Sequence, residues 1–137
     1  MPRMLDAAVE ALDQPGLETV EARLVAALDA DGDAVLSADG YLLLTPANLG
    51  YMSGALKHMF DVTYPAAVGR TTGRPYGVIV HGESDTTGAI RSVEMVTTGL
   101  QWRRACPAVS LIGPVDEAGL DRCGEAAAVV AATALGF

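Results

Sequence analysis

The stretch "ADGYLLLTPANLGYMSGALKHMFD", residues 38–61, places an apolar run, a loop and the start of a helix in direct succession. The run from Tyr41 to Thr45 does not alternate with polar residues, which is typical of a strand covered on both faces of a sheet. Apolar residues then recur at helical spacing: Leu56, Met59, Phe60 and Tyr64. Ser53 is the expected N-cap of this helix and Pro65 its expected end. The stretch therefore predicts a central strand that leads through a loop into an amphipathic helix.

The rest of the chain repeats this alternation. Helices are predicted around residues 2–16, 90–100 and 120–134, a short helical turn near 34–40, and strands over 17–25, 76–81 and 107–113. In the strand over 17–25, Val20, Ala22 and Leu24 alternate with polar residues, so it is expected to be buried on one face or to lie at an edge. The order predicts one α/β domain, residues 1–137, with a parallel sheet, helices on both faces and right-handed crossovers.

Composition and charge narrow the class of protein. Acidic residues outnumber Lys and Arg by 17 to 9, and the net charge of −8 argues against nucleic acid as a partner. No window is apolar enough for a membrane span, so a cytoplasmic protein is expected. Cys106 and Cys123 lack metal-ligand spacing and are expected to be free thiols. The "DADGD" stretch after Leu28 departs from the spacing of a calcium loop, so no metal site is predicted.

Ligands of open parallel sheets bind beyond the carboxyl ends of the strands, and two loops qualify: 45–53 and 81–88. In the first, Gly50 allows close backbone approach, while Pro46 stiffens the turn. Amides near Asn48 and Gly50 would then face a flat polar ring. The alternative is an ordinary connection between a strand and a helix.

The second loop, "HGESDTTG", brings a histidine close to acidic and hydroxyl side chains. His81 with Glu83, Ser84 or Asp85 suggests acid/base chemistry, but the order matches no catalytic triad arrangement. The more economical interpretation is a loop whose backbone lines a ligand, with Asp85 or Thr86 capping the next helix. No catalytic side chain is therefore predicted.

With these elements placed, residues 38–61 resemble the flavodoxin-like NAD(P)H-dependent FMN reductases and quinone reductases, in which "aDg", a strand, "tPtyxgxmsgxlKxflD" and a helix recur. The resemblance continues more loosely through "RPYGVIVHGESDTTGAIRSVE". It implies a flavodoxin-like fold with strand order 2-1-3-4-5. It also implies flavin contacts in both loops: Thr45, Pro46, Ala47, Asn48, Leu49, Gly50, Tyr51 and Met52 in the first, and His81, Gly82, Glu83 and Asp85 in the second.

The sequence departs from this family before its first helix. The family opens with a strand and a Ser/Thr-rich loop that wraps the FMN phosphate, whereas Pro2 and Arg3 stand where that loop should end. The missing strand would be central in the sheet. Three explanations are open: a longer natural chain truncated here at its N-terminus, flanking strands that close up, or a second chain that fills the gap. The first is preferred.

The resemblance implies an FMN-dependent oxidoreductase that takes hydride from NAD(P)H and passes electrons to a quinone, a flavin or a similar small acceptor. The flavin would supply the redox chemistry. The alternatives are a flavodoxin-fold binding module or fragment without flavin, and a one-electron carrier of the flavodoxin type. A homodimer or homotetramer is expected by resemblance to the family.

Overall fold

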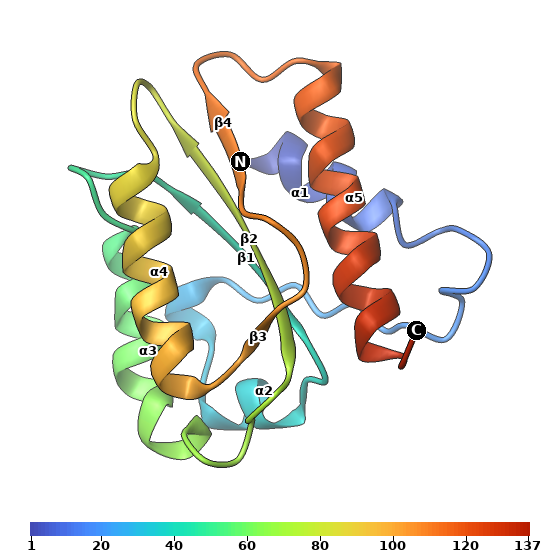
Figure 1. The fold of residues 1–137 in the computed structure, drawn as a ribbon, viewed down its shortest axis with the longest axis vertical. Helices are drawn as coiled ribbons and strands as arrows, with labels where there is room; N and C mark the ends of the chain where they lie inside the picture. Colours follow the sequence, from blue (N-terminus) through green and yellow to red (C-terminus); the bar gives the residue numbers. More distant parts are fainter.

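A computed structural model describes residues 1–137, which form a parallel sheet with helices on both faces (Figure 1). Strand β1 (Tyr41–Pro46) pairs with β2 (Pro75–Gly82). The other edge of β2 pairs first with the short β3 (Arg103–Arg104) and then with β4 (Val109–Ile112). All three pairings are parallel, which confirms the predicted α/β class.

The helices form two layers around this sheet (Figure 1). One layer contains α3 (Gly54–Ala67) and α4 (Thr87–Leu100), with η1 (Ala27–Asp29) and α2 (Gly32–Ser37) against α3. The other layer contains α1 (Pro2–Glu10) and the long α5 (Glu117–Ala134), which lie side by side. None of these helices has the length and hydropathy needed to cross a membrane.

Each face of the sheet has its own apolar core because side chains alternate along a strand. Val78 and Val80 of β2 lie in the core beneath α3 and α4, with Phe60 and Val93. Ile79, between them, lies in the second core with residues of α1 and α5. Strand β2 is therefore buried on both sides, which is why its sequence is a continuous apolar run.

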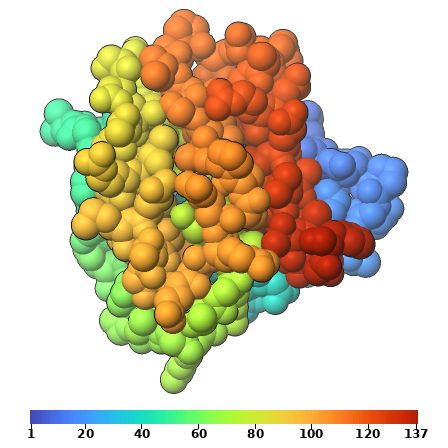
Figure 2. All heavy atoms as spheres, viewed as in Figure 1, coloured from blue at the N-terminus to red at the C-terminus, as the bar shows by residue number.

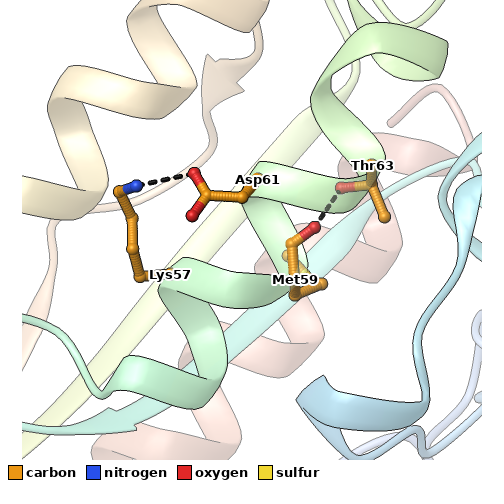
Figure 3. Close-up of polar contacts among 4 residues, drawn as sticks. All are labelled: Lys57, Met59, Asp61 and Thr63. Carbon is orange, nitrogen blue, oxygen red and sulfur yellow. Dashed lines mark hydrogen bonds and ion pairs between the residues drawn. The ribbon is translucent and has the colours of Figure 1, made fainter.

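Helix α3 is stabilised by an N-cap and by side-chain contacts within the helix. The Ser53 side chain accepts a hydrogen bond from the amide of Leu56, which confirms the predicted N-cap. Figure 3 shows two contacts further along: an exposed Lys57–Asp61 ion pair of 2.6 Å, and the Thr63 hydroxyl, which donates to the Met59 carbonyl over 2.7 Å. The second contact satisfies a hydroxyl that is buried in the core.

The predicted end of α3 at Pro65 is wrong, because the helix continues to Ala67. A proline inside a helix removes one hydrogen bond, here to the carbonyl four residues earlier. That carbonyl belongs to the exposed Asp61, where water can replace the lost donor. The first helix also ends before its predicted limit, at Glu10.

The strand predicted over residues 17–25 is not formed. No strand of the sheet lies beside this segment, so its backbone has no partner to pair with. Residues 21–26 are exposed, and none of their amides donates a backbone hydrogen bond. Strand β1 pairs with β2 alone, so the flanking strands do not close up over the gap either.

The two cysteines are free, as predicted, with Cys123 buried and Cys106 half-buried. Burial raises the pKa of both thiols, which keeps them protonated at neutral pH. No group of three or more His, Cys, Asp or Glu side chains lies close enough together to hold a metal ion.

Candidate functional site

The carboxyl ends of β1, β2 and β4 lie at the same edge of the sheet because the strands are parallel (Figure 1). Three loops leave this edge, at residues 47–53, 83–86 and 113–116. The sequence predicted the first two as the site and missed the third. The loops begin the connections to α3, α4 and α5, so all three are anchored on regular structure.

The first loop is held at both of its ends. The amide of Ala47 donates to the His81 carbonyl over 2.8 Å, which extends the pairing with β2 by one residue. The buried hydroxyl of Thr45 accepts from the amide of Ser53 at 2.9 Å and donates to the Pro46 carbonyl. Thr45 therefore closes the loop from inside the protein, and its side chain does not face a ligand.

Between these anchors the loop makes a tight two-residue turn. Asn48 and Tyr51 exchange two backbone hydrogen bonds, of 2.8 and 3.0 Å, around Leu49 and Gly50. Both central residues have positive φ, 50° at Leu49 and 75° at Gly50, as a type I′ turn requires. Glycine adopts this geometry readily, but leucine does so at a cost of about 1–2 kcal/mol.

The side chain of Leu49 is fully exposed, so no packing interaction compensates for its strained backbone. In the space-filling view of Figure 2, the loop projects as a small knob from the outline of the molecule, next to α4. Residues with strained backbone conformations cluster at active sites and ligand-binding sites, so Leu49 marks this turn as a candidate. The turn therefore presents an apolar side chain and free backbone to whatever binds at this edge.

The turn is seated against the first turn of α4. A Cβ atom on Gly88 would lie 2.0 Å from the carbonyl oxygen of Gly50, so only glycine allows this approach. The neighbouring amide of Met52 donates to the buried Ser92 hydroxyl over 3.1 Å, and Ser92 in turn donates to the Ala89 carbonyl. The Met52 side chain is buried in the core and does not face the loop surface.

The second loop is tied to the third by His81. Its Nε2 donates to the carbonyl of Gly113 over 2.7 Å, and the amide of Gly113 donates to the Gly82 carbonyl over 2.8 Å. Gly82 is also buried, with space for a Cβ limited by Ala47 and Thr86. The predicted residues His81 and Gly82 are therefore positioned by structural contacts.

The acidic residues of the second loop point to solvent. Asp85 accepts from the amide of Thr87 at 2.9 Å, and this hydrogen bond holds the pKa of the Asp85 carboxyl below its ordinary value. Asp85 thus supplies the predicted helix-capping contact at the start of α4, one residue before Thr86, whose side chain makes no capping bond. Glu83 is exposed and makes no side-chain hydrogen bond or ion pair.

Backbone amides without a hydrogen-bond partner are the groups at this edge that could bind a ligand. Several loop amides donate no backbone hydrogen bond: Leu49, Gly50, Glu83, Ser84 and Asp85. They lie in the two loops that the sequence predicted as a ligand site. Uncharged N–H donors on rigid loops suit the carbonyl oxygens and ring nitrogens of a flat heterocycle.

Helix α1 begins at the same edge of the sheet, next to the third loop. Arg3 donates from Nη1 to the Val115 carbonyl of the third loop over 3.1 Å, and the helix has no side-chain N-cap. The free amides of the first two loops thus fit the ring of a flat heterocyclic ligand.

Two shallow hollows occur elsewhere on the molecule. One, of about 430 Å³, lies between residues 14–17 and the second half of α5, and the other, of about 340 Å³, lies between α3 and Val96 of α4. Neither is lined by residues of the three loops. We place the candidate site at the loops because their hydrogen bonding and strain, which a hollow by itself lacks, point to a ligand.

Comparisons with known proteins identify the fold. An archaeal flavodoxin superposes with a TM-score of 0.81 at 11% sequence identity, with 98% of this chain and 90% of that chain covered. The flavodoxin, WrbA-like protein from Agrobacterium tumefaciens gives 0.75 at 17% identity, with 98% and 89% covered. An NADPH-quinone reductase from P. pentosaceus gives 0.64 at 16% identity, with 90% and 86% covered. The protein therefore has the flavodoxin-like fold.

No family model matches the sequence, and neither does any curated protein. The likeness to the solved structures is therefore one of architecture, at identities too low to transfer an activity.

The sequence analysis did not identify Ser92 and Gly113 as residues that shape the site, and it placed Gly88 in the second loop without assigning it a role. Gly88 had a visible signal, because a glycine at the start of a helix has low helix propensity and invites a packing explanation. Ser92 had none, since it lies mid-helix and contacts the loop 40 residues away in sequence. Gly113 has positive φ after β4, which a glycine following an apolar run suggests.

Proposed function

We propose that the protein binds FMN at the three loops and acts as an NAD(P)H-dependent oxidoreductase, with a quinone, a flavin or a similar small molecule as acceptor. The observation that carries this proposal is the rigid turn at Leu49 and Gly50, with its strained apolar tip and free amides beside the second loop. When bound, FMN would supply the transfer of hydride and electrons.

The roles of the chain's own residues follow from their placement. The amides of Gly50 and Glu83 are free to donate to polar atoms of the ring, and Leu49 offers an apolar contact against it. Thr45, Ser92 and Gly88 keep the first loop in place. No side chain has to donate or remove a proton in this scheme.

The structural neighbours support the class of function. They include proteins named as flavodoxins and one named as an NADPH-quinone reductase, and the present chain spans about nine-tenths of their length. Affinity for riboflavin comparable to that for FMN would follow if the ring provides most of the contacts.

The proposal is tested by titrating the purified protein with FMN and, separately, with riboflavin. Visible absorbance and flavin fluorescence report binding, and oxidation of NADH or NADPH with a quinone present reports activity. We expect saturable binding of both flavins and acceptor-dependent oxidation of one nicotinamide cofactor. No binding of either flavin would refute the proposal at its first step.

A one-electron carrier is the second candidate, favoured by the net charge of −8. Acidic carriers meet basic partner proteins rapidly through electrostatic steering. A carrier would bind flavin but oxidise NAD(P)H only when a partner reductase is added, whereas the proposed enzyme needs no partner. The same titration followed by a nicotinamide assay therefore separates the two candidates.

A further inference from the structure

The hollow between α3 and α4 combines an apolar floor with polar groups at its rim. It has a volume of about 340 Å³. Most of its lining residues follow one side of α3 at helical spacing, and one belongs to α4: Lys57, Phe60, Asp61, Tyr64, Pro65 and Val96. Phe60 is buried in the core, so an aromatic ring closes the hollow from below.

Two oxygen atoms at this hollow lack a donor within the protein. Pro65 has no amide hydrogen, so the Asp61 carbonyl loses the bond that the fourth residue along a helix normally supplies. The Tyr64 hydroxyl makes no hydrogen bond, although it reaches α4, where a Cβ on Gly99 would lie 2.6 Å from it. Because every buried side-chain oxygen has a partner, this unpaired hydroxyl is open to solvent. Both oxygens can therefore accept from a ligand.

Asp61 also brings a carboxylate to the hollow. Its Oδ1 lies 2.6 Å from the Lys57 ammonium, and Figure 3 shows this pair on the outside of α3. Both side chains are exposed, and an exposed ion pair contributes little to stability, so Lys57 can give way to another cation. Apart from Lys57, the polar groups of the hollow are acceptors, on a protein of net charge −8.

The charge and shape of these groups match an arginine side chain. A guanidinium group is a planar cation with five N–H donors, and it stacks on aromatic rings while donating in a fork. The carboxylate and the carbonyl of Asp61 offer acceptors for the fork, and Tyr64 offers a ring. A lysine ammonium supplies the charge without the planar fork.

The surface around the hollow indicates what carries this arginine. Helices α3 and α4 each have 14 residues and follow parallel strands, so the seam between them is about 21 Å long. Such a seam suits an amphipathic helix. A second copy of the chain could offer Arg91, an exposed residue of α4 with no ion pair. It would also bring a second net charge of −8, which opposes the contact, whereas a basic helix is attracted.

We propose that the hollow between α3 and α4 binds an arginine on a basic amphipathic helix of a partner protein. The guanidinium donates to the carboxylate and carbonyl of Asp61 and lies against Tyr64, while Lys57 turns to solvent. Apolar side chains of the same helix pack on the exposed Met95 beside the hollow. No residue of the three loops lines this hollow, so the proposal does not depend on flavin binding.

The test is the binding of a synthetic helical peptide to the purified protein, followed by fluorescence anisotropy. The peptide has about 18 residues, with leucines and one central arginine on its apolar face and lysines on the other. We expect saturable binding that weakens at least about fivefold when citrulline, a neutral side chain of the same shape, replaces the arginine. Moving the arginine to the polar face, at the same composition, should weaken binding as much.

Variants of the protein locate the arginine. Asp61→Asn should weaken binding of the arginine peptide and reduce the difference between the arginine and citrulline peptides, because the two changes remove the same ion pair. Pro65→Ala restores an amide that bonds the Asp61 carbonyl, so it should weaken binding while the protein becomes more stable. Val62→Asn, an exposed position of α3 that does not line the hollow, should leave the affinity unchanged.

Three outcomes would overturn the proposal. The peptide could fail to bind at concentrations up to about 1 mM. The arginine and citrulline peptides could bind equally well, or Asp61→Asn and Pro65→Ala could both leave the affinity unchanged. The protein could instead form a dimer that competes with the peptide and that Arg91→Gln disrupts, which would make a second copy of the chain the occupant.

Discussion

At the scale of single residues, Leu49 combines positive φ with a side chain that contacts nothing. Asparagine tolerates this backbone conformation better than leucine. We therefore expect Leu49→Asn to stabilise the protein by about 0.5–1 kcal/mol while weakening flavin binding, a trade of stability against function. Urea unfolding followed by circular dichroism and flavin titration measure the two effects. Val62→Asn on α3, another exposed apolar position, is the matched control and should leave flavin affinity unchanged.

Gly88 is the residue on which the position of the first loop depends. In Gly88→Val the added atoms would overlap the Gly50 carbonyl, so the turn must move or α4 must shift. We expect a loss of about 1–3 kcal/mol in the free energy of unfolding and a large loss of flavin affinity. Gly54→Ala, at a helical position with open space around its Cα, should preserve both properties. Equal stability of the two variants would contradict the observed approach.

Asp85 gives the start of α4 a predictable response to pH. Its folded pKa lies below the ordinary value of 3.8 because the ionised carboxylate accepts from the Thr87 amide. The contribution to stability is therefore complete above about pH 4 and is lost as the pH falls through the folded pKa. Asp85→Asn keeps an acceptor without the charge. Its thermal midpoint should lie below that of the unmodified protein at pH 7, and the difference should shrink between pH 4 and pH 2.

At the scale of elements, α2 is held at its end by the guanidinium group of Arg74, a residue distant in sequence. Arg74, next to the start of β2, donates from Nη1 to the carbonyls of Leu36 and Ala38 over 2.7 and 2.9 Å. The same nitrogen lies 3.2 Å from the hydroxyl of Tyr41. These bonds satisfy carbonyls at the end of a helix of only six residues.

Removing this cation should destabilise the whole domain. We expect Arg74→Met to lower the free energy of unfolding by about 1–3 kcal/mol, since several charge-assisted hydrogen bonds disappear together. Arg70→Met, which changes an exposed arginine four residues earlier, is the matched control and should have an effect within about 0.5 kcal/mol. Equal urea midpoints for both variants would show that Arg74 contributes no more than a surface arginine.

The elements also show what the sequence could predict. β1, β2, β4 and the three long helices carry strong periodic or continuous apolar patterns, and each was predicted to within a few residues. The prediction of a strand over 17–25 was wrong because alternating apolar and polar residues indicate only a preference for a strand. A strand forms only where another strand is present to pair with it. In the site, local turn chemistry predicted the loop at Gly50. The contact between the Met52 amide and Ser92 is a property of tertiary packing and had no local pattern of its own.

At the scale of the whole molecule, charge is unevenly distributed. The first 39 residues hold nine of the 17 acidic residues but only two of the nine basic ones. Repulsion within this region opposes the compact state at low ionic strength and is screened when the Debye length shortens from about 30 Å at 0.01 M to about 8 Å at physiological salt.

Salt should therefore stabilise the protein. We expect the urea midpoint to rise when NaCl is increased from about 0.01 to about 0.15 M. A variant with Glu10→Gln and Asp13→Asn should show a smaller rise, and one with Asp121→Asn and Glu125→Gln on α5 should behave like the unmodified protein. A midpoint that falls with salt would indicate that attractive ion pairs, not repulsion, dominate the surface.

The single tryptophan of this protein, Trp102, gives it one fluorescent side chain at a fixed position. Trp102 is buried at the amino ends of the strands, stacked on Tyr41 at 3.9 Å between ring centroids and fixed by a 2.7 Å bond from its indole N–H to Thr71. It is thus one emitter, with one orientation, at the opposite end of the sheet from the three loops. A bound chromophore that absorbs its emission will dim it by energy transfer through space, to an extent set by their separation. The quenching of Trp102 fluorescence therefore reports how far along the sheet from Trp102 a coloured ligand lies.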